Sequence, residues 1–131
     1  MSVKQEIIKE MTFEIPVNHI QESADWYCKY LGFELASPVT GVVDLKIPSG
    51  TKICLFRPNF EDVTSYWYMP KKEENYRVRI CFLVSNVGQL LKDLKEAGLE
   101  VNELVGEEGI GYNFKLKDPN GNTLALWGGF T

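Results

Sequence analysis

The hydrophobic pattern changes its period early in the chain. Apolar residues in the segment Met11–Val17 alternate with polar ones, which predicts a half-buried β-strand. After this strand, apolar side chains recur with the period of one helix face. Gly32 is expected to end the helix, because glycine readily takes the left-handed conformation found after a helix. The positions on this predicted helix face are Ile20, Ala24, Tyr27 and Leu31.

The same order of elements recurs in the second half of the chain. Val78–Val84 is a second apolar strand, and a second amphipathic helix is predicted after it. Asn86 and Gln89 are spaced for a capping box at its start, and Gly98 marks its end. The two copies are offset by about 66 to 67 residues, which indicates an internal repeat. The face of the second helix consists of Val87, Leu90, Leu91, Leu94 and Ala97.

Three short strand-like runs, separated by turn residues, follow each helix, so each half is predicted to be a βαβββ module in an α+β fold. One helix and one sheet cannot close a core alone, so the two sheets should curl toward each other or pair with those of a second chain. We expect one domain over 1–131, with modules at 11–57 and 77–128 and a linker or lid at 58–76. The later strands are expected at 33–36, 42–47, 52–57, 100–105, 112–117 and 123–127.

Charge and hydropathy exclude two classes of partner. The net charge of −4 has the wrong sign for a protein that grips a phosphate backbone, so nucleic acid is not expected. No apolar run approaches the roughly 18 residues of a membrane span, and no signal-peptide stretch follows the charged start. We therefore expect a cytoplasmic protein without a membrane partner.

Histidine and cysteine usage limits the metal chemistry. His19 is the only histidine, so one subunit cannot supply two imidazoles to a zinc or iron site. Its place at the start of the first helix suggests a capping or surface role. Cys28, Cys54 and Cys81 are odd in number and far apart, which favours free thiols over a disulfide framework or a thiolate zinc site.

Several motifs carry a family resemblance. Trp26-Tyr27, the helix end Tyr30-Leu-Gly-Phe-Glu34 and the turn Asp118-Pro-Asn-Gly-Asn122, within two βαβββ copies, resemble the glyoxalase/bleomycin resistance/dioxygenase superfamily, also called vicinal oxygen chelate proteins. The turn has its own physical reading, because Asp118 can accept hydrogen bonds from the following backbone and Gly121 permits a positive φ. The resemblance implies cupped mixed sheets that enclose a pocket, and a homodimeric assembly.

In enzymes of this family, four side chains hold a divalent metal ion. The resemblance places these four positions at Thr12, Cys54, Arg79 and Ala125. Only the thiol of Cys54 resembles a metal ligand, and the permanent charge of Arg79 would repel a dication. We therefore expect no metal and no other cofactor, which disfavours metal-dependent glyoxalase, dioxygenase or fosfomycin-type transferase activity.

Strand alternation identifies the other side chains that share the pocket face. The candidate site combines an acid, a base, thiols and aromatic rings, and two aromatic residues of the linker could cover it. The expected ligand-binding residues are Thr12, Glu14, Cys54, Phe56, Tyr66, Trp67, Arg79, Cys81, Ala125 and Trp127.

Each of these residues also has a purely structural interpretation. Glu14 and Arg79 form either a buried ion pair between the modules or a ligand-binding pair. Cys54 and Cys81 are interpreted as inert core thiols rather than nucleophiles, because no histidine is at hand to activate them. The aromatic run that begins at Tyr66 forms either a lid or a dimer contact.

Three hypotheses for function follow. The first is a metal-independent protein, similar to the bleomycin-resistance branch, which sequesters an aromatic or amphipathic small molecule in the cupped sheets. The second is a metal-free lyase or isomerase in which Glu14 is the general base and Arg79 anchors an anionic substrate. The third is an interaction or regulatory domain whose own side chains fill the pocket.

Overall fold

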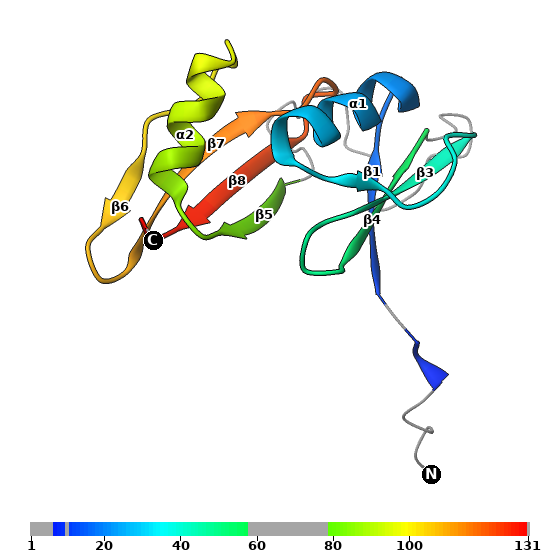
Figure 1. The fold of residues 1–131 in the computed structure, drawn as a ribbon, viewed down its shortest axis with the longest axis horizontal. Helices are drawn as coiled ribbons and strands as arrows, with labels where there is room; N and C mark the ends of the chain where they lie inside the picture. Colours follow the sequence, from blue (N-terminus) through cyan, green and yellow to red (C-terminus); the bar gives the residue numbers. More distant parts are fainter. Residues whose placement is uncertain (1–6, 10, 58–78, 131) are drawn as a thin grey trace, which may run out of the picture. The chain divides into compact units, whose positions relative to one another are not determined.

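The computed structural model describes residues 7–9, 11–57 and 79–130. The chain divides into two compact units, residues 1–63 and 64–131. Each unit contains one four-stranded mixed sheet and one long helix (Figure 1). The predicted α+β fold of two βαβββ modules is therefore confirmed.

The first unit begins with β1 (Thr12–Pro16) and α1 (Ile20–Leu31). The sheet order is β1-β4-β3-β2, with β1 and β4 parallel and the other neighbours antiparallel. The first strand of the module is thus an edge strand, and it pairs with the last strand of the module. The remaining strands are β2 (Glu34–Leu35), β3 (Val42–Lys46) and β4 (Lys52–Phe56).

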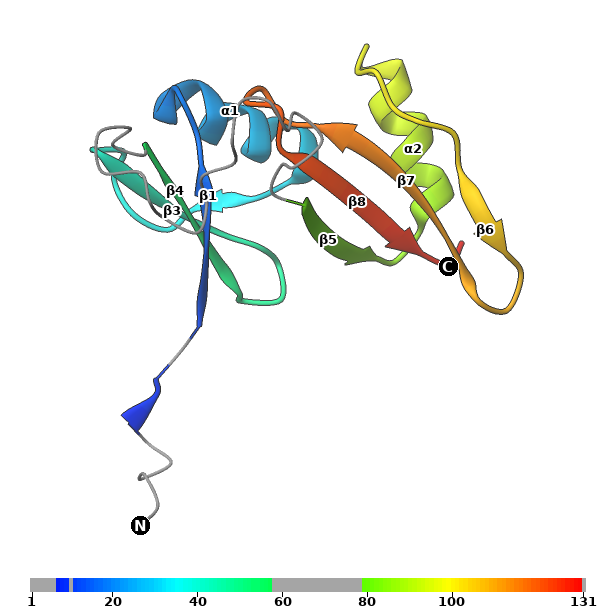
Figure 2. The same cartoon turned by 180° about the vertical axis from the view of Figure 1, so that it is seen from behind.

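Helix α1 packs on one face of this sheet and leaves the other face open (Figures 1 and 2). Gly32 ends the helix with φ 71°, and its backbone N–H donates to the carbonyl of Tyr27. His19 occupies the N-cap position, exposed, and its side chain makes no capping hydrogen bond. The core between helix and sheet consists of Ile15, Val17, Ala24, Tyr27, Phe33, Val43, Leu45, Ile53 and Leu55.

The second unit repeats this arrangement with β5 (Arg79–Val84) and α2 (Val87–Glu96). Its sheet order is β5-β8-β7-β6, again with the first and last strands parallel. Helix α2 packs against β7 and β8 on one face of the sheet. The later strands are β6 (Val105–Glu107), β7 (Gly111–Lys117) and β8 (Thr123–Gly128).

The start of α2 confirms half of the predicted capping box. The Oδ1 atom of Asn86 accepts from the backbone N–H of Gln89 at 3.0 Å. The side-chain amide of Gln89 donates instead to the carboxylate of Asp93 at 2.8 Å, one helical turn further on. An acidic partner four residues away thus takes the place of the return hydrogen bond.

The strand predicted at 100–105 is wrong in its extent. Only β6 is regular there, and it begins at Val105. Before it, the N–H of Asn102 donates to the carbonyl of Lys115 at 3.0 Å, so the chain follows β7 without forming a continuous ladder. No helix in the described part of the chain is long and apolar enough to cross a membrane.

Candidate functional site

The open face of the first sheet carries a row of three polar side chains. In the register of the strands, Glu14 on β1 and Asp44 on β3 both lie opposite Cys54 on β4. Residues one position away on these strands, such as Ile15, Val43 and Leu55, are fully buried on the α1 side. Alternation therefore places the two carboxylates and the thiol together on the uncovered face.

This row determines the protonation of Cys54. Burial raises the pKa of the Cys54 thiol, the charge of Asp44 and a hydrogen bond to Asp44 raise it further, and Glu14 adds a smaller effect. The thiol therefore remains protonated at neutral pH. Because the thiolate is the reactive form, Cys54 is a poor nucleophile in this environment.

Phe56 and Thr12 lie on the same face as this row, and each is two positions away from it along its strand, in opposite directions. Phe56 pairs with Pro16 and Val42, and Thr12 pairs with Lys52. The open face thus changes along the strands from hydroxyl and ammonium groups, through the carboxylate and thiol row, to an apolar end.

The open face of the second sheet has the same layout with different chemistry. Cys81 on β5 and Lys115 on β7 both lie opposite Ala125 on β8. Ala125 is buried, whereas Cys81 is exposed. The exposure of Cys81 contradicts its interpretation as a core thiol, because its side chain lies on the open face of the sheet.

One end of this open face is apolar. Leu83 and Trp127 are register partners there, with 70 % and 43 % of their surfaces exposed. A concavity of about 510 Å³ lies beside them, and Ile110 and Phe130 also line it. Phe130 packs on Tyr112 with ring centroids 4.7 Å apart.

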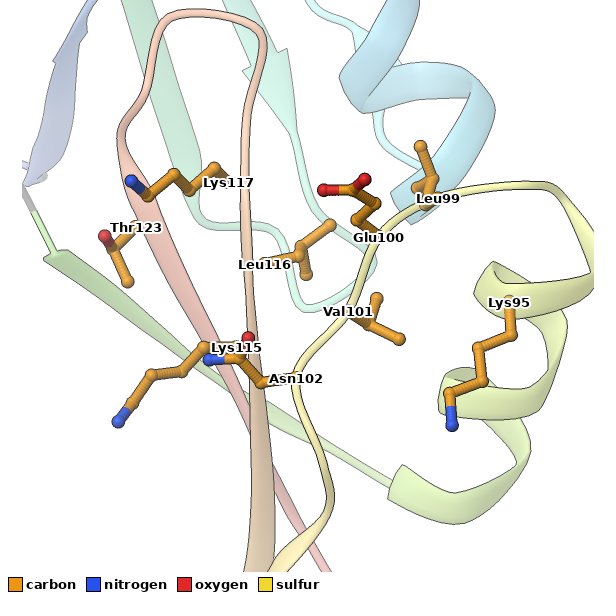
Figure 3. Close-up of a pocket in the computed structure, with 9 residues that line it drawn as sticks. All are labelled: Lys95, Leu99, Glu100, Val101, Asn102, Lys115, Leu116, Lys117 and Thr123. Atoms are coloured by element: carbon orange, nitrogen blue, oxygen red, sulfur yellow. The ribbon is translucent and has the colours of Figure 1, made fainter.

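The opposite end of the face is basic. Lys117 and Arg79 both lie in register with Thr123. A cavity of about 900 Å³ lies along β7 at this end, where residues 99–102 run beside the strand. Figure 3 shows Lys115, Lys117 and Thr123 directed to one side of the sheet, while Leu116 and Val101 lie on the side of α2.

The four positions at which relatives hold a metal ion do not fit one here. Thr12 offers a neutral hydroxyl and Ala125 a methyl group, while the raised pKa of Cys54 opposes the thiolate that a metal requires. Arg79 brings a permanent positive charge into its strand. Among the described residues, no group of three His, Cys, Asp or Glu side chains is placed to hold a metal ion.

The structure does not place two aromatic residues of the expected site, and it does not test one expected ion pair. Tyr66 and Trp67 lie outside the described residues, so their expected role as a lid or dimer contact stays a prediction. The backbone of Arg79 begins β5, opposite Thr123 rather than opposite the strand that carries Glu14. The ion pair between Arg79 and Glu14 likewise stays a prediction.

Asp44 and Lys115 were missed by the sequence reasoning. They lie on β3 and β7, which neighbour the strands that carry metal ligands in the family. The alternation of Val42–Lys46 and of Gly111–Lys117 contained the signal, because each strand buries every second residue.

Comparison with known proteins agrees with this architecture. The family model of the Glyoxalase/Bleomycin resistance protein/Dioxygenase superfamily matches residues 11–126. No curated protein sequence matches the chain.

Three of the solved structures with the same fold have different descriptions. A hypothetical protein from S. aureus is 28 % identical, with a TM-score of 0.69 over 94 % of this chain and 95 % of its own. A glyoxalase/bleomycin resistance protein/dioxygenase from Alicyclobacillus acidocaldarius is 20 % identical, with a TM-score of 0.66 over 98 % and 96 %. A lactoylglutathione lyase from Agrobacterium tumefaciens is 16 % identical, with a TM-score of 0.66 over 95 % and 94 %. Since the family model covers most of the sequence and these structures share the topology, the chain belongs to the glyoxalase/bleomycin resistance protein/dioxygenase superfamily.

Proposed function

We propose that this protein binds a small aromatic or amphipathic molecule without a metal ion, on the open sheet faces that form a cup in the family. Exposed Trp127 carries the proposal, because a large ring on an uncovered sheet face provides a stacking surface. The concavity beside it supplies further apolar area from Leu83, Ile110 and Phe130. A few polar groups around an apolar surface are typical of small-molecule sites.

The chemistry at the former ligand positions favours binding over metal-assisted catalysis. Three of the four side chains, at Thr12, Arg79 and Ala125, are of types that do not ligate a divalent ion in this family. The fourth, Cys54, is held as a neutral thiol beside Asp44.

The test uses N-phenyl-1-naphthylamine, a neutral aromatic probe whose fluorescence rises on transfer to an apolar site. We expect saturable binding that is unchanged by EDTA and by added zinc or nickel. Trp127→Ala should weaken the affinity by about tenfold, because the stacking surface is lost. Leu35→Ala is the matched control, since Leu35 is an exposed apolar residue of β2.

Two results would overturn the proposal. One is probe binding that requires a stoichiometric divalent ion. The other is metal-free turnover of a substrate that is abolished by Glu14→Gln, which would favour the lyase or isomerase hypothesis. Glu22→Gln, an exposed acid on α1, is the control for that substitution.

We also propose that the protein acts as a cytoplasmic homodimer. Exposed Ile8, Met11 and Val105, which lie outside the proposed ligand site, supply apolar surface of the kind that self-association buries. Sedimentation equilibrium tests this proposal, and a monomer at micromolar concentration would contradict it.

A further inference from the structure

The two repeats carry different charges at equivalent positions of their open faces. Asp44 in the first sheet and Lys115 in the second each lie opposite the central residue of the last strand, Cys54 or Ala125. On the other side of that central residue, Glu14 in the first sheet is replaced by Cys81 in the second. Two carboxylates thus give way to an ammonium group and a thiol.

The second sheet consequently has a basic open face in an acidic protein. Its three cross-strand rows are Arg79–Thr123–Lys117, Cys81–Ala125–Lys115 and Leu83–Trp127–Asn113, and none contains a carboxylate. The net charge of the whole chain is −4, so the basic character is local to this face.

Among the described residues of this unit, Asp118 follows Lys117, but its carboxylate accepts hydrogen bonds within the turn between β7 and β8. Glu107 is on β6 opposite Gly111, about 20 Å along β7 from Lys117 at the usual rise per residue. Glu100 lies across β7 from Lys115 and Lys117 (Figure 3). Within the part of the chain that the structure describes, neither lysine forms an ion pair.

The spacing along β8 fits an elongated ligand. Thr123, Ala125 and Trp127 follow one another on the open face, so about 13 Å separates the hydroxyl end from the indole end. Ala125 between them is buried and projects only a methyl group. A flat molecule could lie along this strand with one end at Thr123 and the other at Trp127.

We propose that the open face of the second sheet selects an aromatic anion. Its carboxylate, sulfonate or phosphate group binds at Lys117 and Thr123, with Lys115 beside them and Arg79 in register, and its ring system lies over Ala125 toward Trp127. Lys115 and Lys117 form no ion pair among the described residues and so attract such a group, and hydrogen bonds to a charged acceptor are stronger than neutral ones. This inference rests on the proposed binding function and specifies its ligand class.

The test compares two probes that differ by one sulfonate group. These are 8-anilino-1-naphthalenesulfonate and its neutral counterpart N-phenyl-1-naphthylamine, titrated into the full chain at low salt. We expect the anion to bind more tightly than the neutral probe. Lys117→Met and Lys115→Met should each lower the affinity for the anion by about tenfold and leave the affinity for the neutral probe unchanged.

Lys92→Met is the matched control, because Lys92 is an exposed lysine on α2 and its replacement changes the net charge equally. Displacement of the bound anion by benzoate and by phenyl phosphate distinguishes carboxylate from phosphate recognition. Thermal unfolding of each variant shows that the fold is retained.

The possible failures are distinct. If neither probe binds, the proposed binding function itself is wrong. Selection by this face is refuted if both probes bind with equal affinity, or if Lys92→Met lowers the affinity for the anion as much as Lys117→Met does. The proposed binding function is not affected by either result. A large loss of thermal stability in both lysine variants would assign the lysines a structural role and also overturn the inference.

Discussion

Replacing Asp118 by alanine should destabilise the second unit strongly. Asp118 is only 5 % exposed, and its carboxylate accepts from the N–H of Asn120 at 2.8 Å and of Asn122 at 2.9 Å. The side-chain amide of Asn122 donates to its other oxygen at 2.8 Å. These bonds hold the turn between β7 and β8, which brings Lys117 opposite Thr123.

The magnitude follows from the lost hydrogen bonds. A hydrogen bond to a charged acceptor contributes about 1.5–3 kcal/mol, and water entering the truncated site recovers part of the loss. We therefore expect Asp118→Ala to lower the free energy of unfolding by about 3 kcal/mol. Asp118→Asn should cost less, because one carbonyl acceptor remains.

Urea unfolding followed by circular dichroism measures this loss. With a slope of about 2 kcal/mol/M, the midpoint should fall by about 1.5 M. Glu108→Ala, at an exposed acid in the turn between β6 and β7, should change the free energy by less than about 0.5 kcal/mol. A free-energy change of Asp118→Ala as small as that of Glu108→Ala would refute the assignment of the carboxylate as the support of the turn.

Three further predictions concern other parts of the fold. Thiol labelling at pH 7, measured by peptide mass spectrometry, should modify exposed Cys81 well before Cys54. Burial and neighbouring carboxylates raise the pKa of Cys54, so its reactive thiolate forms only at higher pH. Faster labelling of Cys54 would contradict this prediction. Asn86→Ala removes the 3.0 Å hydrogen bond that caps α2 and should lower the free energy of unfolding by about 1 kcal/mol. An unchanged melting temperature would contradict a stabilising role of this cap. Gly128→Ala should cost on the order of 3 kcal/mol or prevent folding, because the alanine Cβ would overlap the carbonyl oxygen of Val84 and φ is 154°; normal urea stability would disprove this close approach.

The sequence predicted most of the fold because local signals and tertiary packing agree in this chain. Alternation in 11–17 and the helical period that follows correspond to β1 and α1, and Gly32 ends the helix as expected. The segment 100–105 was wrongly predicted because its two valines and one leucine resemble a strand, whereas the ladder with β7 forms only from Val105. Apolar content alone does not supply a hydrogen-bonding partner.

The candidate site was harder to predict because it depends on which strands are neighbours. The pairing of Glu14 with Cys54 joins residues about 40 positions apart, and alternation within one strand cannot reveal it. The same holds for Asp44, whose effect on the pKa of Cys54 arises only across the strand pair. Burial of every second residue was predictable, but the cross-strand rows required the register.

The place of β8 between β5 and β7 has a consequence for how the chain is synthesised. Each sheet is completed only by the last strand of its module, so the second sheet cannot assemble until residues 123–128 have left the ribosome. Until then β5 has no neighbour, and its apolar edge is open to wrong pairing. The first sheet needs only residues up to Phe56 and can form much earlier. Stalled or shortened nascent chains should therefore aggregate through β5 rather than through β1.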